Sequence, residues 1–386
     1  MISNRYVTET DLNEVTQCYI QWDSSQSDPT IGFTGLNKLS DTTSRLKWVQ
    51  KYCRHCVFKN GAVNYYLDES NLNKKVDGSA AVLTGADGDV MLEIDTLYWK
   101  VTVDNGVFGI TVSPYNPDGT WATAHRYGDQ ILKHIYIGVF EGVLVDNKLR
   151  SINTSSAPRT SATQPQFCTW AAANGARYYI ESYTARTLWQ ILTTFVIGTR
   201  NSQAVVGNGN VKASAAIAVN DNWSATEPWI KGSSDSNVGV TCLGIHNPWG
   251  NVWELMANTI FNNGNLYFSV RNNDNYNISS GSGSRPSTWR SVATGCGTYA
   301  SQSYIQDVCK DAYATFFPSS YSGGSASTYY CDGVWSNPGD RYCQAGGAWQ
   351  YGALCGTFCT AVNSPNGTSD PRIGARLQAY GTEVIS

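Results

Sequence analysis

Alternating apolar and polar residues dominate the stretch from 88 to 145. In GDVMLEIDTLYWKVTVDNGVFGITVSP (88–114), apolar residues recur at every second position, which is typical of half-buried strands. Asp104-Asn105-Gly106 separates two such runs, and an Asn-Gly pair favours the tight turn of a hairpin. KHIYIGVFEGVLV (133–145) has the same alternation, with glycines where the chain could turn. The pattern therefore predicts two pairs of neighbouring strands.

A helical pattern precedes these strands. In SRLKWVQKYCRHCVF (44–58), the residues Leu46, Val49, Cys53 and Val57 recur at a spacing that places them on one helix face. Asp41 or Thr42 could cap its start, and Gly61 follows its end. We expect a helix whose apolar face packs onto the rest of the protein.

Two more helices are predicted after the strands. PQFCTWAAANGARYY (165–179) favours a short helix, and SYTARTLWQILTTFVIGT (182–199) a longer one. Ser182 or Thr184 could cap the longer helix, and Gly198 could end it. From residue 200 onward the pattern indicates loops and short strands. We therefore divide the chain into an N-terminal helix-containing region, 1–75, and a domain over 76–386.

The number and spacing of the cysteines give little indication of a metal site. Cys53-Arg54-His55-Cys56 is the only CxxC motif among 11 cysteines, and no second ligand pair follows it. Because it falls within the helical pattern, two partly buried helix cysteines are the preferred interpretation. The N-terminus lacks the basic and apolar regions of a secretory signal, so we expect reduced thiols.

Composition excludes some partners and favours others. The net charge is −3, only 15% of residues are charged, and no Lys/Arg run occurs, so nucleic acid is not an expected partner. No apolar run is long enough to cross a bilayer, so no membrane insertion is expected. The chain has 23 Tyr and 36 Gly with abundant Ser and Asn, a mixture that suits adaptable binding surfaces.

Three motifs in the C-terminal half resemble one known group of proteins. GNVWE (250–254), AGGAW (345–349) and IGARL (373–377) are similar to the GNVWE, GGSW and GFR elements of the formylglycine-generating-enzyme branch of the C-type lectin fold, in the same order. The resemblance covers about residues 76–380. It implies an α+β C-type lectin fold with short strands, two helices and many loops.

Within that branch, the sequence most resembles the variable proteins of diversity-generating retroelements, which include the tropism determinants of phage tail fibres. In these proteins, adenines are randomised near the end of the gene, and Asn codons are typical targets. Changing the adenines of an Asn codon cannot give Trp, Gln, Lys, Glu or Met. From Ser319 to Gly374 the chain has no Lys, Glu or Met, which fits a hypervariable region at about 330–364.

The resemblance and the codon argument together define the expected ligand-binding residues. All of them can be reached from an Asn codon, and they lie between recurring Gly, Trp and Phe residues that resemble a scaffold. They are Tyr330, Cys331, Asp332, Tyr342, Cys343, Ala348, Tyr351, Ala353, Leu354, Cys355, Cys359, Ala361, Asn363 and Ser364. We expect them to be exposed, because exposed side chains can change without cost to the core.

The expected function is receptor binding without catalysis. The partner would be a protein or glycan on a host cell surface, and the protein would be cytoplasmic before assembly into a phage or prophage tail. The resemblance implies a homotrimer. No cofactor is expected. Asn251 and Glu254 are calcium candidates, but hydrogen bonds to loop backbone, with Trp253 in the core, are preferred for this motif.

Two alternatives remain open. One is a formylglycine-generating-type oxidase using Cys355 and Cys359, although their offset from Trp349 differs from that of the enzymes. The four histidines are scattered and give no obvious metal triad. The other is a static structural tail protein without diversification.

Overall fold

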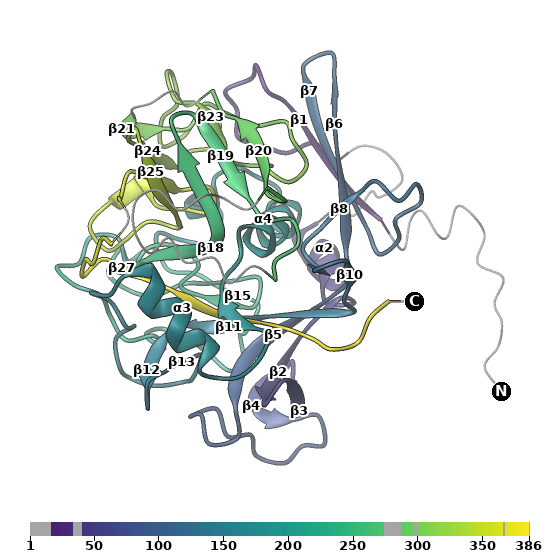
Figure 1. Ribbon diagram of the computed structural model, residues 1–386, viewed down its shortest axis with the longest axis vertical. Coiled ribbons are helices and arrows are strands. Elements are labelled where there is room, and N and C mark those ends of the chain that lie inside the picture. Colours follow the sequence, from purple (N-terminus) through teal and green to yellow (C-terminus); the bar gives the residue numbers. More distant parts are fainter. Residues whose placement is uncertain (1–16, 34–40, 274–286, 296–299, 366, 386) are drawn as a thin grey trace.

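Strands dominate the architecture of this chain. The computed structural model describes residues 17–33, 41–273, 287–295, 300–365 and 367–385. Within these ranges the chain forms 28 strands, mostly in antiparallel sheets, but only four α-helices (Figure 1). The predicted α+β class with a C-type lectin fold is therefore wrong, because helices are a small minority of a mainly β architecture. Abundant Tyr, Val and Thr favour strands, and frequent Gly and Asn keep these strands short.

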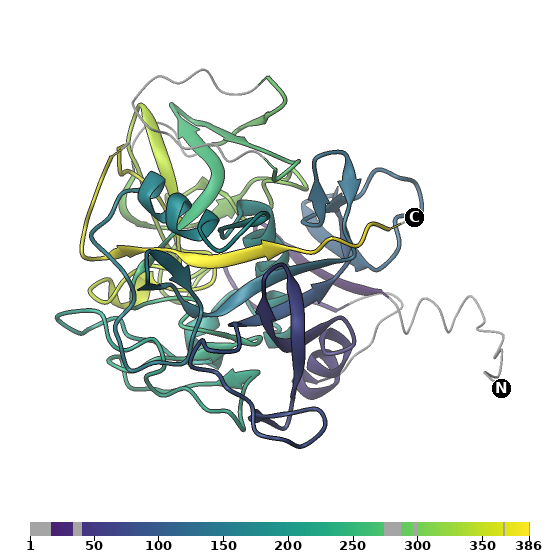
Figure 2. The ribbon, with the colours of Figure 1, turned by 60° about the horizontal axis from the view of Figure 1, so that its bottom comes forward.

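A seven-stranded antiparallel sheet joins distant parts of the chain. The C-terminal strand lies inside it, between strands from residues 134–141 and 178–180, and crosses the middle of the view in Figure 2. In sheet order, the strands are β14 (Tyr178–Ile180), β28 (Arg376–Tyr380), β11 (His134–Glu141), β5 (Asp89–Asp95), β2 (Cys53–Lys59), β3 (Ala62–Asp68) and β4 (Asn71–Lys75). The sheet thus runs across the predicted boundary at residue 75. The division into an N-terminal region, 1–75, part of which lies outside the described ranges, and a domain over 76–386 stays a prediction.

An eight-stranded sheet carries most of the C-terminal third. In order, its strands are β20 (Arg290–Ala293), β19 (Asn265–Phe268), β18 (Trp253–Asn262), β25 (Asp340–Ala345), β26 (Thr360–Val362), β24 (Gly333–Ser336) and β21 (Ala300–Tyr304). The short strand β27 (Ile373–Gly374) lies off this order and pairs in parallel with the start of β18. All three motifs of the sequence resemblance therefore touch or adjoin β18.

The predicted hairpin is confirmed. Its strands β6 (Tyr98–Asp104) and β7 (Val107–Ser113) pair in antiparallel register around Asn105 and Gly106, whose φ angles of 48° and 85° are those of a tight turn. The hairpin belongs to a four-stranded sheet of order β1 (Cys18–Asp23), β7, β6 and β8 (Ala122–Thr123). Figure 1 shows β6 and β7 projecting from the upper right of the molecule.

The second predicted strand pair does not form, because its two strands pair with other strands. β11 pairs with β5 and β28, whereas β12 (Val143–Val145) pairs with β13 (Lys148–Arg150). The chain turns at Gly142, whose N–H donates to Ala375 O at 2.9 Å, so the two segments enter different sheets. The remaining short strands are β9 (Arg126–Tyr127), β10 (Gln130–Ile131), β15 (Ile230–Lys231), β16 (Thr241–Cys242), β17 (Ile245–His246), β22 (Asp307–Val308) and β23 (Pro318–Ser320).

The longer predicted helix forms the centre of the core. All residues of α4 (Tyr183–Ile197) are buried, and Figure 1 shows it in the middle of the molecule. Gly198, with φ of 74°, ends it in the left-handed conformation. The shorter helix is α3 (Gln164–Ala172), and a brief helix α5 (Ser202–Val205) follows α4. No helix among the described residues has the length and apolar character needed to cross a membrane.

The N-terminal helix is shorter than predicted. α2 (Thr42–Val49) starts at the N-cap Asp41, whose Oδ1 accepts from Ser44 N at 2.8 Å, but it ends before the first cysteine of the CxxC motif. That motif lies in β2, whose pairing with β5 overrides the helical pattern. Side chains three positions apart on a strand point to opposite faces, so Cys53 and Cys56 enter different core clusters. The two thiols therefore do not form a zinc ligand pair.

We expect Ser182→Ala to destabilise the protein by about 1 kcal/mol, because it removes the cap of α4. Ser182 Oγ accepts from Ala185 N at 3.2 Å. The midpoint of urea denaturation measures the loss. Ser234→Ala, at an exposed serine, is the matched control and should change stability by no more than about 0.5 kcal/mol. Equal midpoints for the two variants would contradict a capping role.

Candidate ligand-binding site

A polar pocket of about 300 Å³ opens on the eight-stranded sheet. Six strands of that sheet contribute to it, together with the loop between β25 and η1 (Gly352–Leu354) and the loop that follows β26. Its lining residues are Trp253, Ser301, Gln302, Trp335, Gln344, Gln350, Tyr351, Ala361, Asn363, Ser364, Asp370, Arg372 and Ile373. The pocket thus unites segments that are more than a hundred residues apart in the sequence.

Strand register explains why these residues meet. Gln344 on β25 lies opposite Ala361 on β26, and Ala361 lies opposite Trp335 on β24. Residues opposite each other on neighbouring strands share one face of a sheet. Trp253 joins them from β18, where it pairs with Ile373 of β27. The floor of the pocket is therefore set by backbone pairing, and not by a single loop.

Three aromatic side chains form one wall. The ring centroids of Trp253, Trp335 and Tyr351 lie 5.2 Å (Trp253–Trp335), 5.6 Å (Trp253–Tyr351) and 5.0 Å (Trp335–Tyr351) apart. At these separations the rings touch one another, so nothing can insert between them. Trp253 and Trp335 are only 4% and 6% exposed, whereas Tyr351 is partly exposed. The wall is a rigid support with one accessible tyrosine.

The charges in the pocket cancel. Asp370 and Arg372 are the only charged residues among the described residues that line it, and two guanidinium nitrogens meet the two carboxylate oxygens at 2.7 and 2.6 Å. The hydrogen bond from Arg372 lowers the pKa of Asp370, and the same bond raises the pKa of Arg372. Both groups are therefore charged at neutral pH. Arg372 Nη1 also donates to Tyr351 Oη at 3.0 Å, which orients the tyrosine.

Some predicted binding residues do meet in this pocket. Tyr351, Ala361, Asn363 and Ser364 line it. Leu354 lies beside it on η1 and packs against the same aromatic cluster, and Ala353 on η1 is exposed. Four of the predicted side chains therefore line the pocket, whereas Ala353 and Leu354 are not among its lining residues.

Nine of the predicted ligand-binding residues are buried, so the prediction that they are exposed is wrong. Ala361 is buried in the pocket floor, and eight others are buried elsewhere: Tyr330, Cys331, Asp332, Tyr342, Cys343, Ala348, Cys355 and Cys359. Tyr330 Oη accepts from Trp22 Nε1 at 3.1 Å, and Asp332 Oδ2 accepts from Phe358 N at 2.7 Å. Long-range packing therefore gives these two side chains structural contacts. The ligand-binding assignment of the set stays a prediction.

The geometry around Cys355 and Cys359 does not favour oxidase chemistry. Both side chains are fully buried, and burial raises the pKa of each thiol well above its usual range. The reactive form of cysteine is the thiolate, which this environment disfavours. Cys355 packs tightly against Gly347, where an added Cβ would lie 2.4 Å from Sγ. The pair therefore fills core space. All ten cysteines in the described ranges are free; Cys296 lies outside them.

Asn251 and Glu254 do not fit a calcium ion. Glu254 forms ion pairs with two guanidinium groups: Arg376 Nη2 lies 2.5 Å from Oε1, and Arg186 contacts Oε2. Asn251 Oδ1 already accepts from Asn210 Nδ2 at 3.0 Å and from Ile217 N at 2.8 Å. Calcium prefers several oxygen ligands that are not already neutralised by cations. The oxygens of this motif are instead part of the framework.

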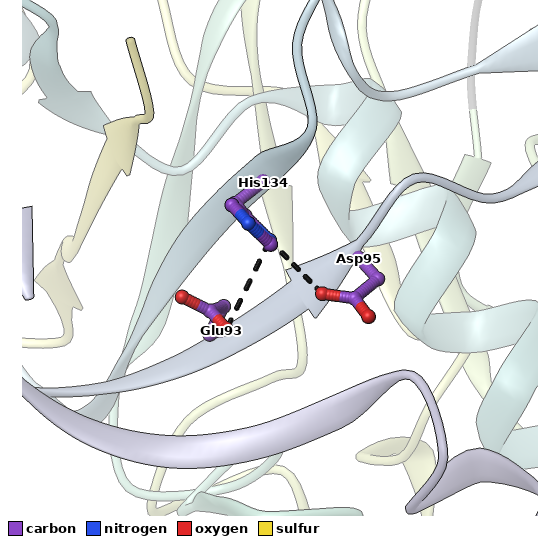
Figure 3. Close-up of side chains that lie close together, drawn as sticks. All are labelled: Glu93, Asp95 and His134. Carbon is purple, nitrogen blue, oxygen red and sulfur yellow. Dashed lines mark ion pairs between the residues drawn. The ribbon is translucent and has the colours of Figure 1, made fainter. Parts of the chain in front are cut away.

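A second cluster with metal-ligating chemistry lies in the seven-stranded sheet (Figure 3). His134 on β11 points between Glu93 and Asp95 on β5, and its Nδ1 lies 2.9 Å from Asp95 Oδ1 and 3.8 Å from Glu93 Oε1. Glu93 Oε1 also accepts from Arg54 Nε at 2.6 Å, and Tyr66 Oη donates to the same carboxylate. A guanidinium held this close would repel a metal cation. The cluster therefore serves as an ion-pair network that joins β2, β3, β5 and β11.

Sequence reasoning missed several pocket residues. An Asn codon cannot yield Gln, so the codon argument excludes Gln344 and Gln350 from the variable set, yet both line the pocket. No sequence motif includes Ser301, Gln302 or Trp335, because their approach depends on pairing between strands far apart in sequence. The one available signal was the proximity of the glutamines to AGGAW.

Comparison with known proteins gives one weak similarity. No protein family and no curated protein matches the chain. Among solved structures, the Major Tropism Determinant U1 variant is 10% identical at a TM-score of 0.29, with 78% of this chain and 83% of that chain covered. The P3c variant is 11% identical at a TM-score of 0.29, with 96% of this chain and 87% of that chain covered. The I1 variant is 10% identical at a TM-score of 0.30, with 97% of this chain and 88% of that chain covered. TM-scores this low do not establish a shared fold.

Proposed function

We propose that this chain is a non-enzymatic receptor-binding protein whose ligand occupies the pocket on the eight-stranded sheet. One observation carries the proposal: predicted variable residues and motif residues meet there. Tyr351, Asn363 and Ser364 lie beside Trp253 of the GNVWE motif and Ile373 of the IGARL motif. A rigid floor surrounded by replaceable side chains suits a binding site that changes its specificity.

The proposal includes diversification by a retroelement, confined to the accessible side chains. Tyr351, Ala353, Leu354, Asn363 and Ser364 are at least partly exposed. Substitutions at exposed sites usually change stability by no more than about 0.5 kcal/mol, whereas core changes cost several times more. The five accessible positions can therefore vary while the buried ones stay constrained.

The biological setting follows from the sequence motifs. Their resemblance to variable proteins of retroelements supports a phage or prophage tail protein that attaches to a protein or glycan on a host cell. Assembly as a homotrimer would present several copies of one site. Multivalent attachment would then compensate for weak binding at each site.

Deep sequencing of the gene in a population that retains function tests diversification. We expect amino-acid changes to concentrate at codons 351, 353, 354, 363 and 364, because these side chains reach solvent. Codons 330, 332, 355 and 359 should be as invariant as codon 253, the internal control, because their side chains are buried. If the five accessible codons vary no more than codon 253, the diversification proposal fails.

A further inference from the structure

We infer that the pocket binds a neutral saccharide directly, without a bridging cation; this inference rests on the proposed receptor-binding function. The charge, the hydrogen-bonding groups and the size of the pocket support this inference. Each of these properties comes from residues on different strands.

The charge of the pocket disfavours strongly ionic ligands. Asp370 and Arg372 neutralise each other through two short contacts, and none of the other described lining residues is charged. An acidic ligand would have to compete with Asp370 for the guanidinium. A cationic ligand would have to compete with Arg372 for the carboxylate. Asp370 is the only carboxylate among the described lining residues, and Arg372 already occupies both of its oxygens, so the pocket offers calcium no free carboxylate.

The hydrogen-bonding groups match a polyhydroxyl ligand. Four carboxamides line the cavity, from Gln302, Gln344, Gln350 and Asn363. Each carboxamide carries an acceptor oxygen and a donor nitrogen on one plane, so it can pair with neighbouring hydroxyls that both donate and accept. Ser301 and Ser364 add two hydroxyls. These groups are uncharged and can both donate and accept hydrogen bonds, as sugar hydroxyls can.

Gln344 gives an independent indication of a missing partner. It is 2% exposed and lines the cavity floor, and its Nε2 has no hydrogen-bond partner within the described residues. A buried amide without a partner costs about 1–3 kcal/mol, which a hydrogen-bonding ligand or water could recover. The unmatched polar group thus belongs to a residue that lines the same cavity as the other carboxamides.

The size of the pocket favours a small unit over a protein surface. A volume of about 300 Å³ lies at the small end of ligand cavities and holds a sugar ring or two. Tyr351 offers a partly exposed ring at the edge of the aromatic wall. A sugar ring can pack its C–H groups on that ring while its hydroxyls reach the amides.

Binding of the full chain to a panel of neutral and acidic oligosaccharides tests this inference. We expect at least one neutral saccharide to bind, and Gln350→Ala and Asn363→Ala each to weaken it at least tenfold. Both residues lie at the accessible rim, so these variants should fold normally. Gln130→Ala, an exposed glutamine on β10 outside the pocket, is the matched control and should bind normally. A chelator should leave binding unchanged. Exclusive binding of acidic saccharides, or binding abolished by the chelator, would overturn the inference.

A parallel assay separates this inference from the proposed function. The same variants are bound to a panel of bacterial strains after the cells have been treated with periodate or with protease. Pocket-dependent attachment that is lost after periodate supports a saccharide. Pocket-dependent attachment that survives periodate and is lost after protease overturns the saccharide but leaves receptor binding intact. Attachment to no strain, or attachment equal in the pocket variants and the control, overturns both.

Discussion

Replacing Arg376 with methionine is expected to lower the free energy of unfolding by about 3–5 kcal/mol. Arg376 is fully buried, and its guanidinium pairs with Glu254 at 2.5 Å. It also donates to Gly138 O and Val139 O at 2.9 Å, and to two carbonyls in the segment before GNVWE. Methionine fills similar space but leaves the Glu254 carboxylate with a single cationic partner, Arg186. A buried carboxylate that loses one of its two cationic partners strongly destabilises the folded state, which explains the expected loss of about 3–5 kcal/mol in the free energy of unfolding.

Arg372→Met is the matched control for this prediction. Arg372 lies four residues earlier and also pairs with a carboxylate, but its side chain is 33% exposed. Because water screens this pair, its loss should cost about 1 kcal/mol or less. Arg376→Lys keeps the charge with fewer donors and should fall between the two. The midpoint of urea denaturation is measured for each variant and compared with that of the natural protein. A cost for Arg376→Met no larger than that of the control would contradict a framework role.

The second large effect concerns pH. Glu141 is fully buried, and desolvation raises the pKa of its carboxyl from 4.5 to about 7, although Arg376 and the amides of Asn251 and Asn247 act in the opposite direction. The unfolded chain releases this proton near pH 4.5, whereas the folded chain keeps it until about pH 7. Between these values the folded state holds the additional proton, so its stability falls as pH rises. Across the whole window the loss is about 3 kcal/mol.

Glu141→Gln should abolish this component because glutamine resembles the protonated acid. The variant is expected to match the natural protein near pH 5 and to exceed its stability by up to about 3 kcal/mol near pH 8. The difference between the two proteins must be measured, because the natural protein has other titrating groups. Burial lowers the pKa of His125 to about 4 and that of His246 to about 3, which makes stability rise with pH at the acidic end.

An exposed glutamate provides the control for the pH experiment. Glu227→Gln removes a carboxylate that lies at the surface, and its stability curve should run parallel to that of the natural protein. Thermal midpoints at pH 5, 6, 7 and 8 give the comparison. A constant difference between Glu141→Gln and the natural protein over this range would show that Glu141 ionises alike in both states.

Several predictions based on turn and cap residues were confirmed. The hairpin around Asn105-Gly106 and the helix between Ser182 and Gly198 occur where predicted. Turn and cap preferences depend on φ angles and on hydrogen bonds spanning only a few residues. The same holds for the start of α2 at Asp41. These features need no tertiary partner to be specified.

Predictions that depend on distant partners were the ones that failed. CRHCVFK fits a helical period, but it becomes β2 because β3 and β5 offer strands on both of its edges. The fold class failed for the same reason, since the short strands beyond residue 200 pair over long distances to form an extended sheet. The spacing of apolar residues alone cannot distinguish a helix from a strand in a short apolar segment.

The sequence by itself determined which side-chain chemistry is available between residues 330 and 364: Tyr, Asn, Ser and small residues, placed between Gly and Trp. Only the tertiary structure decided which of these side chains reach solvent. Strand register brings Ala361 and Gln344 to the pocket floor, while packing buries Tyr330, Asp332 and Cys359. The codon argument could not distinguish the two groups, because the reachable amino acids are a property of the gene. Burial depends on neighbours contributed by the whole chain, and those are fixed only when the sheets pair.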